Sequence, residues 1–113
     1  MKYKFTTNPY GQQDSKMFGV EVLDNSIEAL REISWDGWTP GEAQMIIDRS
    51  MALKDNEEFE YQVEGSDFIM SIDKDEVYFY DLHNQQKEED FKWPLIEFIT
   101  FMKEFKKFIE ENS

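Results

Sequence analysis

The stretch that decides the fold is residues 59–80, which read FEYQVEGSDFIMSIDKDEVYFY. Apolar and polar side chains alternate along it with a period of two, which is the pattern of strands that bury one face. Gly65-Ser66 and Lys74-Asp75 interrupt the alternation and are typical of tight turns. We therefore predict three antiparallel strands in a meander. Their inward side chains are Phe59, Tyr61, Val63, Phe68, Met70, Ile72, Val77 and Phe79, with Tyr78 and Tyr80 on the opposite side.

Upstream of the meander, the chain predicts a hairpin and two helices. Residues 1–6 and 16–23 also alternate, with the turn residues Asn8-Pro9-Tyr10-Gly11 between them. The pattern of residues 25–33 is ambiguous: Ile27, Leu30 and Ile33 fit one face of a short helix, and Asn25 followed by Glu28 resembles a capping box. Thr39-Pro40-Gly41-Glu42 is a stronger helix start, because Thr39 suits the cap, Pro40 the first turn and Glu42 the reciprocal capping position. This helix is expected to run to about Lys54, with Ala43, Ile46, Ile47, Ser50 and Leu53 on its buried face.

Downstream of the meander, residues 84–90 form a polar, acidic loop, and Pro94 is expected to open a last helix. Its apolar stripe follows helical spacing and consists of Leu95, Phe98, Met102, Phe105 and Ile109. The resulting order is β-β-(α)-α-β-β-β-α. We predict an α+β fold in which two main helices pack on one face of an antiparallel sheet of about five strands.

Length and composition indicate one cytoplasmic domain over residues 1–113. The chain has no Cys, so it has neither disulfides nor thiolate metal sites, which fits a reducing compartment. The first residues lack the apolar region of a signal peptide. No apolar run approaches the roughly 20 residues that span a bilayer.

The negative charge is concentrated in one third of the chain. The sequence holds 25 Asp and Glu against 12 Lys and Arg, a net charge of −13. Residues 55–90 hold 13 acidic and 2 basic side chains, a net charge of −11, and the rest is nearly balanced. Such a surface repels nucleic acid and anionic membranes and attracts basic proteins. We therefore expect a basic protein partner, with neither direct nucleic-acid binding nor membrane binding.

Residue types that carry catalysis or hold cofactors are scarce. The single histidine, His83, has no nucleophile pattern beside it, so we read it as a surface residue. Asp73-Lys74-Asp75-Glu76 offers oxygen ligands, but it lacks the calcium-loop pattern and coincides with a turn that the meander needs. With two Arg and no glycine-rich loop, the chain also has no phosphate-binding motif. We predict a protein that is not an enzyme and has no metal or cofactor.

The acidic third also carries aromatic side chains on its outward positions. Glu58, Glu60 and Glu64 share one face of a strand, about 7 Å apart, which has a cost in self-repulsion. Aromatic residues ringed by charge are typical of protein interfaces. The alternative is that a helix covers the tyrosines. The predicted partner-binding residues are Glu58, Glu60, Asp67, Asp75, Tyr78 and Tyr80.

The loop Trp35-Asp36-Gly37-Trp38 is a second candidate for a protein interface. Its two Trp residues could anchor a partner, since Trp dominates interface energetics. They could also close the core beside the helix that begins at Thr39. We favour the core.

Several short segments occur in a characteristic order: Met1-Lys2-Tyr3-Lys4-Phe5, Ala52-Leu53-Lys54, Phe59-Glu60-Tyr61, Gly65-Ser66-Asp67-Phe68, Asp75-Glu76-Val77, Glu89-Asp90-Phe91 and the aromatic last helix. In this order the chain resembles the YacL-type family of small acidic bacterial proteins. The segments are spread over most of the chain and include no sharp motif. That family is uncharacterised, so the resemblance implies no activity.

In size and charge the chain is also similar to the immunity proteins of bacterial toxin systems, including contact-dependent growth inhibition. This resemblance implies a cytoplasmic toxin inhibitor that binds a basic nuclease domain and blocks its substrate site. We therefore predict an immunity protein. Two alternatives stay open: an acidic nucleic-acid mimic of the anti-restriction or anti-CRISPR type, and a housekeeping bacterial protein with an ordinary acidic surface.

Overall fold

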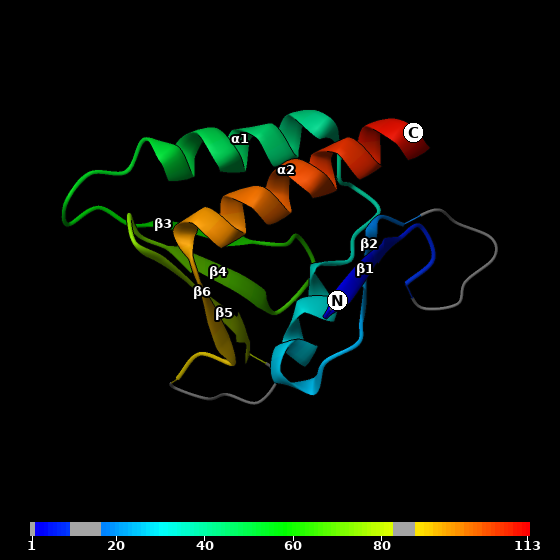
Figure 1. Ribbon diagram of the computed structural model, residues 1–113, viewed down its shortest axis with the longest axis horizontal. Helices are drawn as coiled ribbons and strands as arrows, with labels where there is room; N and C mark the ends of the chain where they lie inside the picture. The colour runs from blue at the N-terminus through cyan, green and yellow to red at the C-terminus, as the bar shows by residue number, and fades with distance from the viewer. Residues whose placement is uncertain (1, 10–16, 83–87) are drawn as a thin grey trace.

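A computed structural model describes residues 2–9, 17–82 and 88–113 of the chain (Figure 1). These residues form two antiparallel sheets, of two and four strands, with two α-helices and one 3-10 helix. The predicted α+β class is confirmed. The prediction of a single sheet of about five strands needs correction, because the N-terminal hairpin forms a sheet of its own and an unexpected strand joins the meander.

The four-stranded sheet contains the predicted meander. Its first three strands are β3 (Phe59–Gln62), β4 (Phe68–Ile72) and β5 (Glu76–Asp81), paired in that order. Gly65 in the first turn adopts a φ of 77°, which glycine reaches without strain. In the second turn the Asp73 carboxylate accepts hydrogen bonds from the backbone N–H groups of Asp75 and Glu76, at 2.8 and 2.7 Å.

The fourth strand, β6 (Phe91–Pro94), was not predicted and pairs with β5 at the edge of the sheet. Pro94 obscured it, because proline interrupts a sheet ladder and suggests a helix start. Proline is nevertheless compatible with the end of an edge strand. The chain then enters α2 (Leu95–Asn112) without a loop, and the Leu95 N–H donates to the Asp75 carbonyl at 2.8 Å.

The N-terminal hairpin pairs β1 (Tyr3–Thr6) with β2 (Gly19–Val22), as predicted from the alternation. The predicted turn between them lies partly outside the described residues. The hairpin packs on the last helix: Phe5 stacks on Phe105 with ring centroids 5.4 Å apart, and Tyr3 meets Phe101 edge-on at 5.2 Å. This contact explains why the hairpin does not extend the other sheet.

The first predicted helix is a 3-10 helix, η1 (Asn25–Ile33), with a break in its geometry at Ile27. Asp24 caps it, since its carboxylate accepts from the Ser26 N–H at 2.8 Å and holds the pKa of Asp24 below its usual value. The predicted cap at Asn25 was therefore one residue late. Ile27, Leu30 and Ile33 are buried, which confirms the predicted apolar face.

The second helix is α1 (Pro40–Met51), three residues shorter than predicted. Thr39 caps it as expected, with the Glu42 N–H donating to its hydroxyl at 3.1 Å. The predicted reciprocal bond from the Glu42 side chain is replaced by a longer-range one. Its Oε2 accepts from the Tyr61 hydroxyl of β3 at 2.7 Å, which ties helix to sheet.

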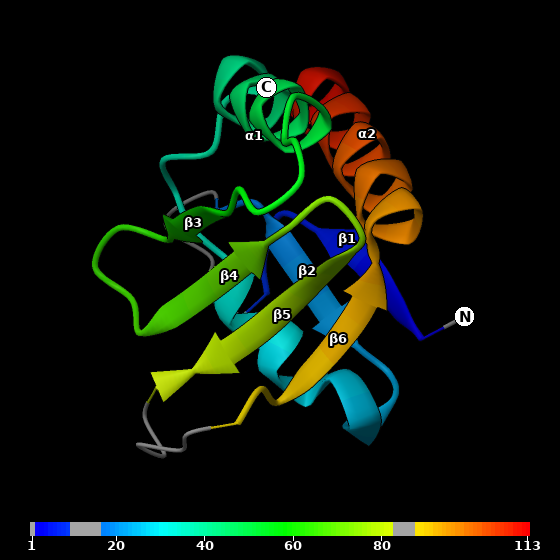
Figure 2. The same ribbon diagram turned by 90° about the vertical axis from the view of Figure 1, so that its left-hand side faces the viewer.

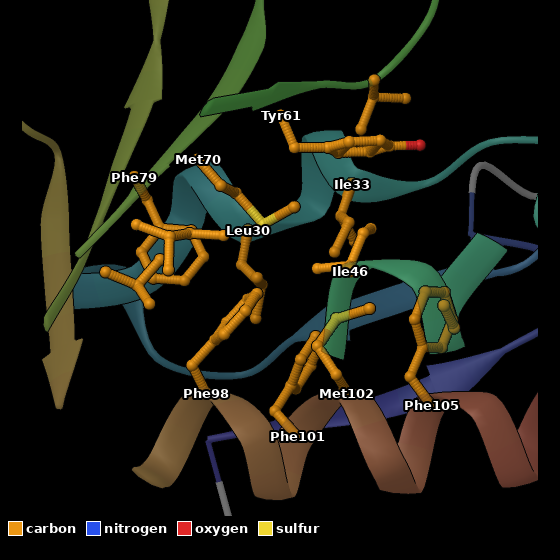
Figure 3. Packing of buried hydrophobic residues seen from close by; sticks show 14 of the residues in the cluster. Leu30, Ile33, Ile46, Tyr61, Met70, Phe79, Phe98, Phe101, Met102 and Phe105 are labelled. Carbon is orange, nitrogen blue, oxygen red and sulfur yellow. The ribbon is translucent and has the colours of Figure 1, made fainter. Parts of the chain in front are cut away.

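All three helical elements lie on the same side of the four-stranded sheet, where they enclose the core (Figures 1 and 3). Side chains from every described helix and strand except β1 contribute fully or nearly fully buried residues to it. Six of the largest, drawn in Figure 3, are Leu30, Ile46, Met70, Phe79, Phe98 and Phe105. The opposite side of the sheet is thereby left open.

Candidate protein-binding face

The open side of the four-stranded sheet is the candidate functional site. In Figure 2 this side faces the viewer, and none of the described helices or strands lies over it. The alternative that a helix covers the outward tyrosines is therefore wrong for the part of the chain that the structure describes. We call this surface the outer face and define it by Glu60, Gln62, Ile69, Ser71, Glu76, Tyr78, Tyr80 and Lys92.

Strand pairing arranges the outer face in rows that cross the sheet. One row runs Glu60, Ser71, Tyr78 and Lys92, from β3 to β6. The next row contains Gln62, Ile69 and Tyr80. Residues opposite each other in adjacent strands lie about 5 Å apart, so each row is a continuous strip of side chains. The β3 edge thus carries one acid and one amide, with the exposed Glu58 before the strand and Glu64 after it, and the two tyrosines lie on β5.

Tyr78 is half-buried between an acid and a base. Its hydroxyl donates to Glu76 Oε1 at 3.2 Å. Lys92 Nζ lies 3.4 Å from Glu76 Oε2 and 6.0 Å from the centre of the Tyr78 ring. Partial burial first, and then the negative charge of Glu76, raises the pKa of Tyr78 above its usual value. The partly exposed phenol is available for packing and hydrogen bonding with a partner.

Tyr80 is half-buried in a more negative setting. Partial burial raises its pKa first, followed by the negative charges of Glu89, Glu58 and Glu60. A ring among carboxylates favours an approaching Lys or Arg in two ways, because the acids attract its charge and the ring face attracts it further. Tyr80 and these acids can therefore receive a basic side chain.

The structure brings some of the six predicted partner-binding residues together. Glu60, Tyr78 and Tyr80 lie on the outer face, and Glu58 immediately precedes β3. Glu58 and Asp75 line an open hollow of about 370 Å³ at one end of the sheet.

Asp67 lies apart from Asp75, at the other end of β4. The five residues of that strand separate them by roughly 17 Å at about 3.4 Å each. A meander places successive turns at opposite ends, so this separation follows from its topology. One basic side chain therefore cannot contact both.

The charged residues Lys92 and Glu76 of the outer face were not among the predicted partner-binding residues. Lys92 was missed because β6 was not predicted, although Phe91 and Trp93 alternate around it and both pack with the core. Glu76 was expected only as part of a turn. Together they form an ion pair that neutralises part of this face.

The other candidate sites have structural roles or lie outside the described residues. The Asp73 carboxylate holds the β4–β5 turn, which supports the turn interpretation of residues 73–76. Among the described residues no group of three or more His, Cys, Asp or Glu side chains is arranged to hold a metal ion. His83 and residues 84–87 of the predicted acidic loop lie outside the described part of the chain.

The preference for a core role is confirmed for Trp38, which is 2% exposed and donates its indole N–H to the Ile33 carbonyl at 2.8 Å. Trp35 is half-buried and packs edge-on against Trp38, with ring centroids 5.5 Å apart. Its ring lies over Gly37, where a Cβ would come within 2.2 Å of it. The two Trp residues therefore close one end of the core.

Comparisons of the chain with family models, with curated proteins and with solved structures find no match. The resemblance to the YacL-type family therefore stays a prediction. In the described ranges, every helix is too short or too polar to cross a membrane.

Proposed function

We propose that this protein is an immunity protein, which binds a cationic toxin domain through the outer face and neutralises it in the cytoplasm. The observation that carries the proposal is the outer face itself, which is open, acidic along β3 and aromatic at its centre. Because function depends on the site rather than the fold, the argument rests on the chemistry of this face.

The physical basis is charge complementarity followed by aromatic packing. A net charge of −11 over residues 55–90 accelerates encounter with a basic partner and repels acidic ones. Tyr78 and Tyr80 then offer large, rigid contact areas at low conformational cost, the usual role of Tyr at interface centres. If the partner is a nuclease, the carboxylates of Glu58 and Glu60 would occupy the sites where it holds phosphates.

A nucleic-acid mimic is the less favoured candidate. Mimicry needs long rows of carboxylates at phosphate-like spacing. On the outer face Glu60 is followed across the sheet by Ser71, Tyr78 and Lys92. This mixed row fits a protein interface better than a copy of a phosphate backbone.

A co-expression rescue tests the proposal. The C-terminal domain of the protein encoded immediately upstream is expressed in bacteria with and without this chain, and surviving cells are counted. We expect killing that this chain reverses. Killing that it does not reverse, or no killing, would contradict the immunity role.

A charge-reversal pair then tests the surface. Glu58→Lys combined with Glu60→Lys should slow association with the toxin domain by about tenfold or more at low salt, because steering depends on these charges. As a matched control we choose Glu110→Lys combined with Glu111→Lys, which makes the same change in net charge at two exposed positions near the far end of α2. Equal association rates for the double variant and the original chain would refute the assignment of this face.

A further inference from the structure

Strand β3 forms one edge of the four-stranded sheet, since the order is β3-β4-β5-β6. An edge strand presents a row of backbone N–H and C=O groups that can pair with another strand. The other edge, β6, ends in Pro94 and passes directly into α2. β3 is therefore the edge better suited to receive an added strand.

The register shows which backbone groups of β3 face outward. The Val63 N–H donates to the Phe68 carbonyl, so Val63 and Phe68 form a hydrogen-bonded pair with β4. In an antiparallel ladder such pairs alternate along the strand. Tyr61 therefore also bonds to β4, whereas the N–H and C=O groups of Glu60 and Gln62 point away from it. Neither residue has a backbone partner outside the sheet among the described residues.

The side chains beside these outward groups are acidic or amide and lie on the outer face. Glu60 and Gln62 are exposed, as are Glu58 before them and Glu64 after them. A strand added at this edge would place its own outer side chains about 5 Å from them. Lys or Arg at alternate positions of that strand would meet carboxylates, and Tyr80 lies on β5, two strands further in than β3.

A second copy of this chain fits the edge poorly. Three symmetric antiparallel registers would use the outward groups of two β3 strands. Pairing about Glu60 would set Glu60 opposite Glu60, pairing about Tyr61 would set Glu58 opposite Glu64, and pairing about Gln62 would set Glu60 opposite Glu64. Like charges directly opposite each other destabilise a strand pair. The same carboxylates that disfavour self-pairing select a basic strand.

We propose that β3 receives a β-strand of the partner with Lys or Arg at alternate positions, which extends the sheet to five strands through the backbone groups of Glu60 and Gln62. This inference rests on the proposed function, because it specifies how the cationic partner would bind. Backbone pairing would supply affinity and the alternate charges would supply register and specificity.

Amide hydrogen exchange followed by NMR tests the proposal on the full chain. The probe is a synthetic peptide of about nine residues in which Lys or Arg alternates with Val or Thr, at roughly physiological salt. We expect exchange of the Glu60 and Gln62 amides to slow by about tenfold or more in its presence, because both become hydrogen-bonded. The Tyr61 amide, already bonded to β4, should change little.

A substitution pair separates backbone pairing from side-chain effects. Gln62→Pro removes the outward N–H and should abolish the added protection and weaken peptide binding. Gln62→Thr loses the same side-chain amide but keeps the N–H, and should bind like the original chain. If circular dichroism shows that the Gln62→Pro variant is misfolded, the exchange experiment on the original chain still tests strand addition.

Three outcomes would overturn strand addition. Peptide binding that perturbs Tyr78 and Tyr80 but leaves the Glu60 and Gln62 amides exchanging freely would refute it and leave the proposed function intact. Absence of peptide binding would refute strand addition, whereas the proposed function is decided separately by the co-expression rescue. A dimer in sedimentation experiments that Gln62→Pro disrupts would show that a second copy occupies the edge instead.

Discussion

The two faces of the four-stranded sheet use tyrosine and glutamate in the same combination for different purposes. On the inner face the Tyr61 hydroxyl donates to Glu42 at 2.7 Å, which joins residues 19 positions apart. On the outer face the Tyr78 hydroxyl donates to Glu76 at 3.2 Å, two positions away on the same strand. The inner pair joins helix α1 to strand β3, whereas the outer pair joins two residues of the same strand, β5. The same type of hydrogen bond, from a Tyr hydroxyl to a Glu carboxylate, therefore supports the fold on the inner face and is available for binding on the outer face.

The largest expected difference between the faces concerns two neighbours on β5. Phe79 is fully buried and stacks on Phe91 with ring centroids 4.3 Å apart, whereas Tyr80 lies on the outer face. Phe79→Ala should lower the free energy of unfolding by about 3–5 kcal/mol through lost burial and a cavity. Tyr80→Ala should lower it by less than about 1 kcal/mol. Urea denaturation measures the free energy of unfolding of both variants. Similar losses for Phe79→Ala and Tyr80→Ala would contradict the distinction between a buried inner face and an exposed outer face.

A smaller effect is expected at the inner phenol. Tyr61→Phe removes the hydroxyl and leaves a partly buried Glu42 carboxylate without this donor, which should cost about 2 kcal/mol. Tyr78→Phe is the matched control, because it deletes the same group from the outer pair. We expect the control to change unfolding much less. A larger loss at Tyr78 would mean that the outer pair also supports the fold.

The pH dependence of stability sharpens the same comparison. Burial, followed by the hydrogen bond to Glu42, raises the pKa of Tyr61 well above its usual 10.0. Above about pH 10, Tyr61 loses its proton in the unfolded chain but keeps it in the folded chain. The free energy of unfolding therefore falls as the pH rises. The stability advantage of the original chain over Tyr61→Phe should be constant from neutral pH to about pH 10 and shrink above it. Denaturation series on both chains measure it, and an advantage that grew with pH would contradict this assignment.

The smallest expected effect is on the acidic edge. Glu60→Lys should change the free energy of unfolding by no more than about 0.5 kcal/mol, since its side chain is exposed and relief of repulsion offsets any loss. Thermal denaturation at low and high salt measures it. A loss of several kcal/mol would show that Glu60 is structural and would remove the reason to assign it to a partner.

Much of the inner face could be predicted from sequence because it depends on local periodicity. The alternation of residues 59–80 placed every inward residue of β3, β4 and β5 correctly, and also placed Tyr78 and Tyr80 outward. β6 could not be predicted in the same way, because four residues ending in Pro94 give too short a pattern. Glu42 was misassigned because a local capping rule competed with a tertiary hydrogen bond to Tyr61.

The outer face was predictable only in part, because membership of a surface depends on topology. Glu58, Glu60 and the two tyrosines follow from strand parity. Asp67 was grouped with Asp75 on charge, although successive turns of a meander lie at opposite ends. Lys92 could not be placed until β6 was known. The sequence therefore indicated the charge of the surface better than its layout.

The packing of the N-terminal hairpin has a consequence for synthesis of the chain. Tyr3 and Phe5 are synthesised long before the rings that cover them, Phe101 and Phe105. The meander needs no such delay, since its contacts are local in sequence. A nascent chain can therefore pair β3, β4 and β5 early, while the aromatic side of the hairpin stays uncovered until α2 has been made. Chains that stop before Phe101 would expose these rings and be targets for chaperones or proteases.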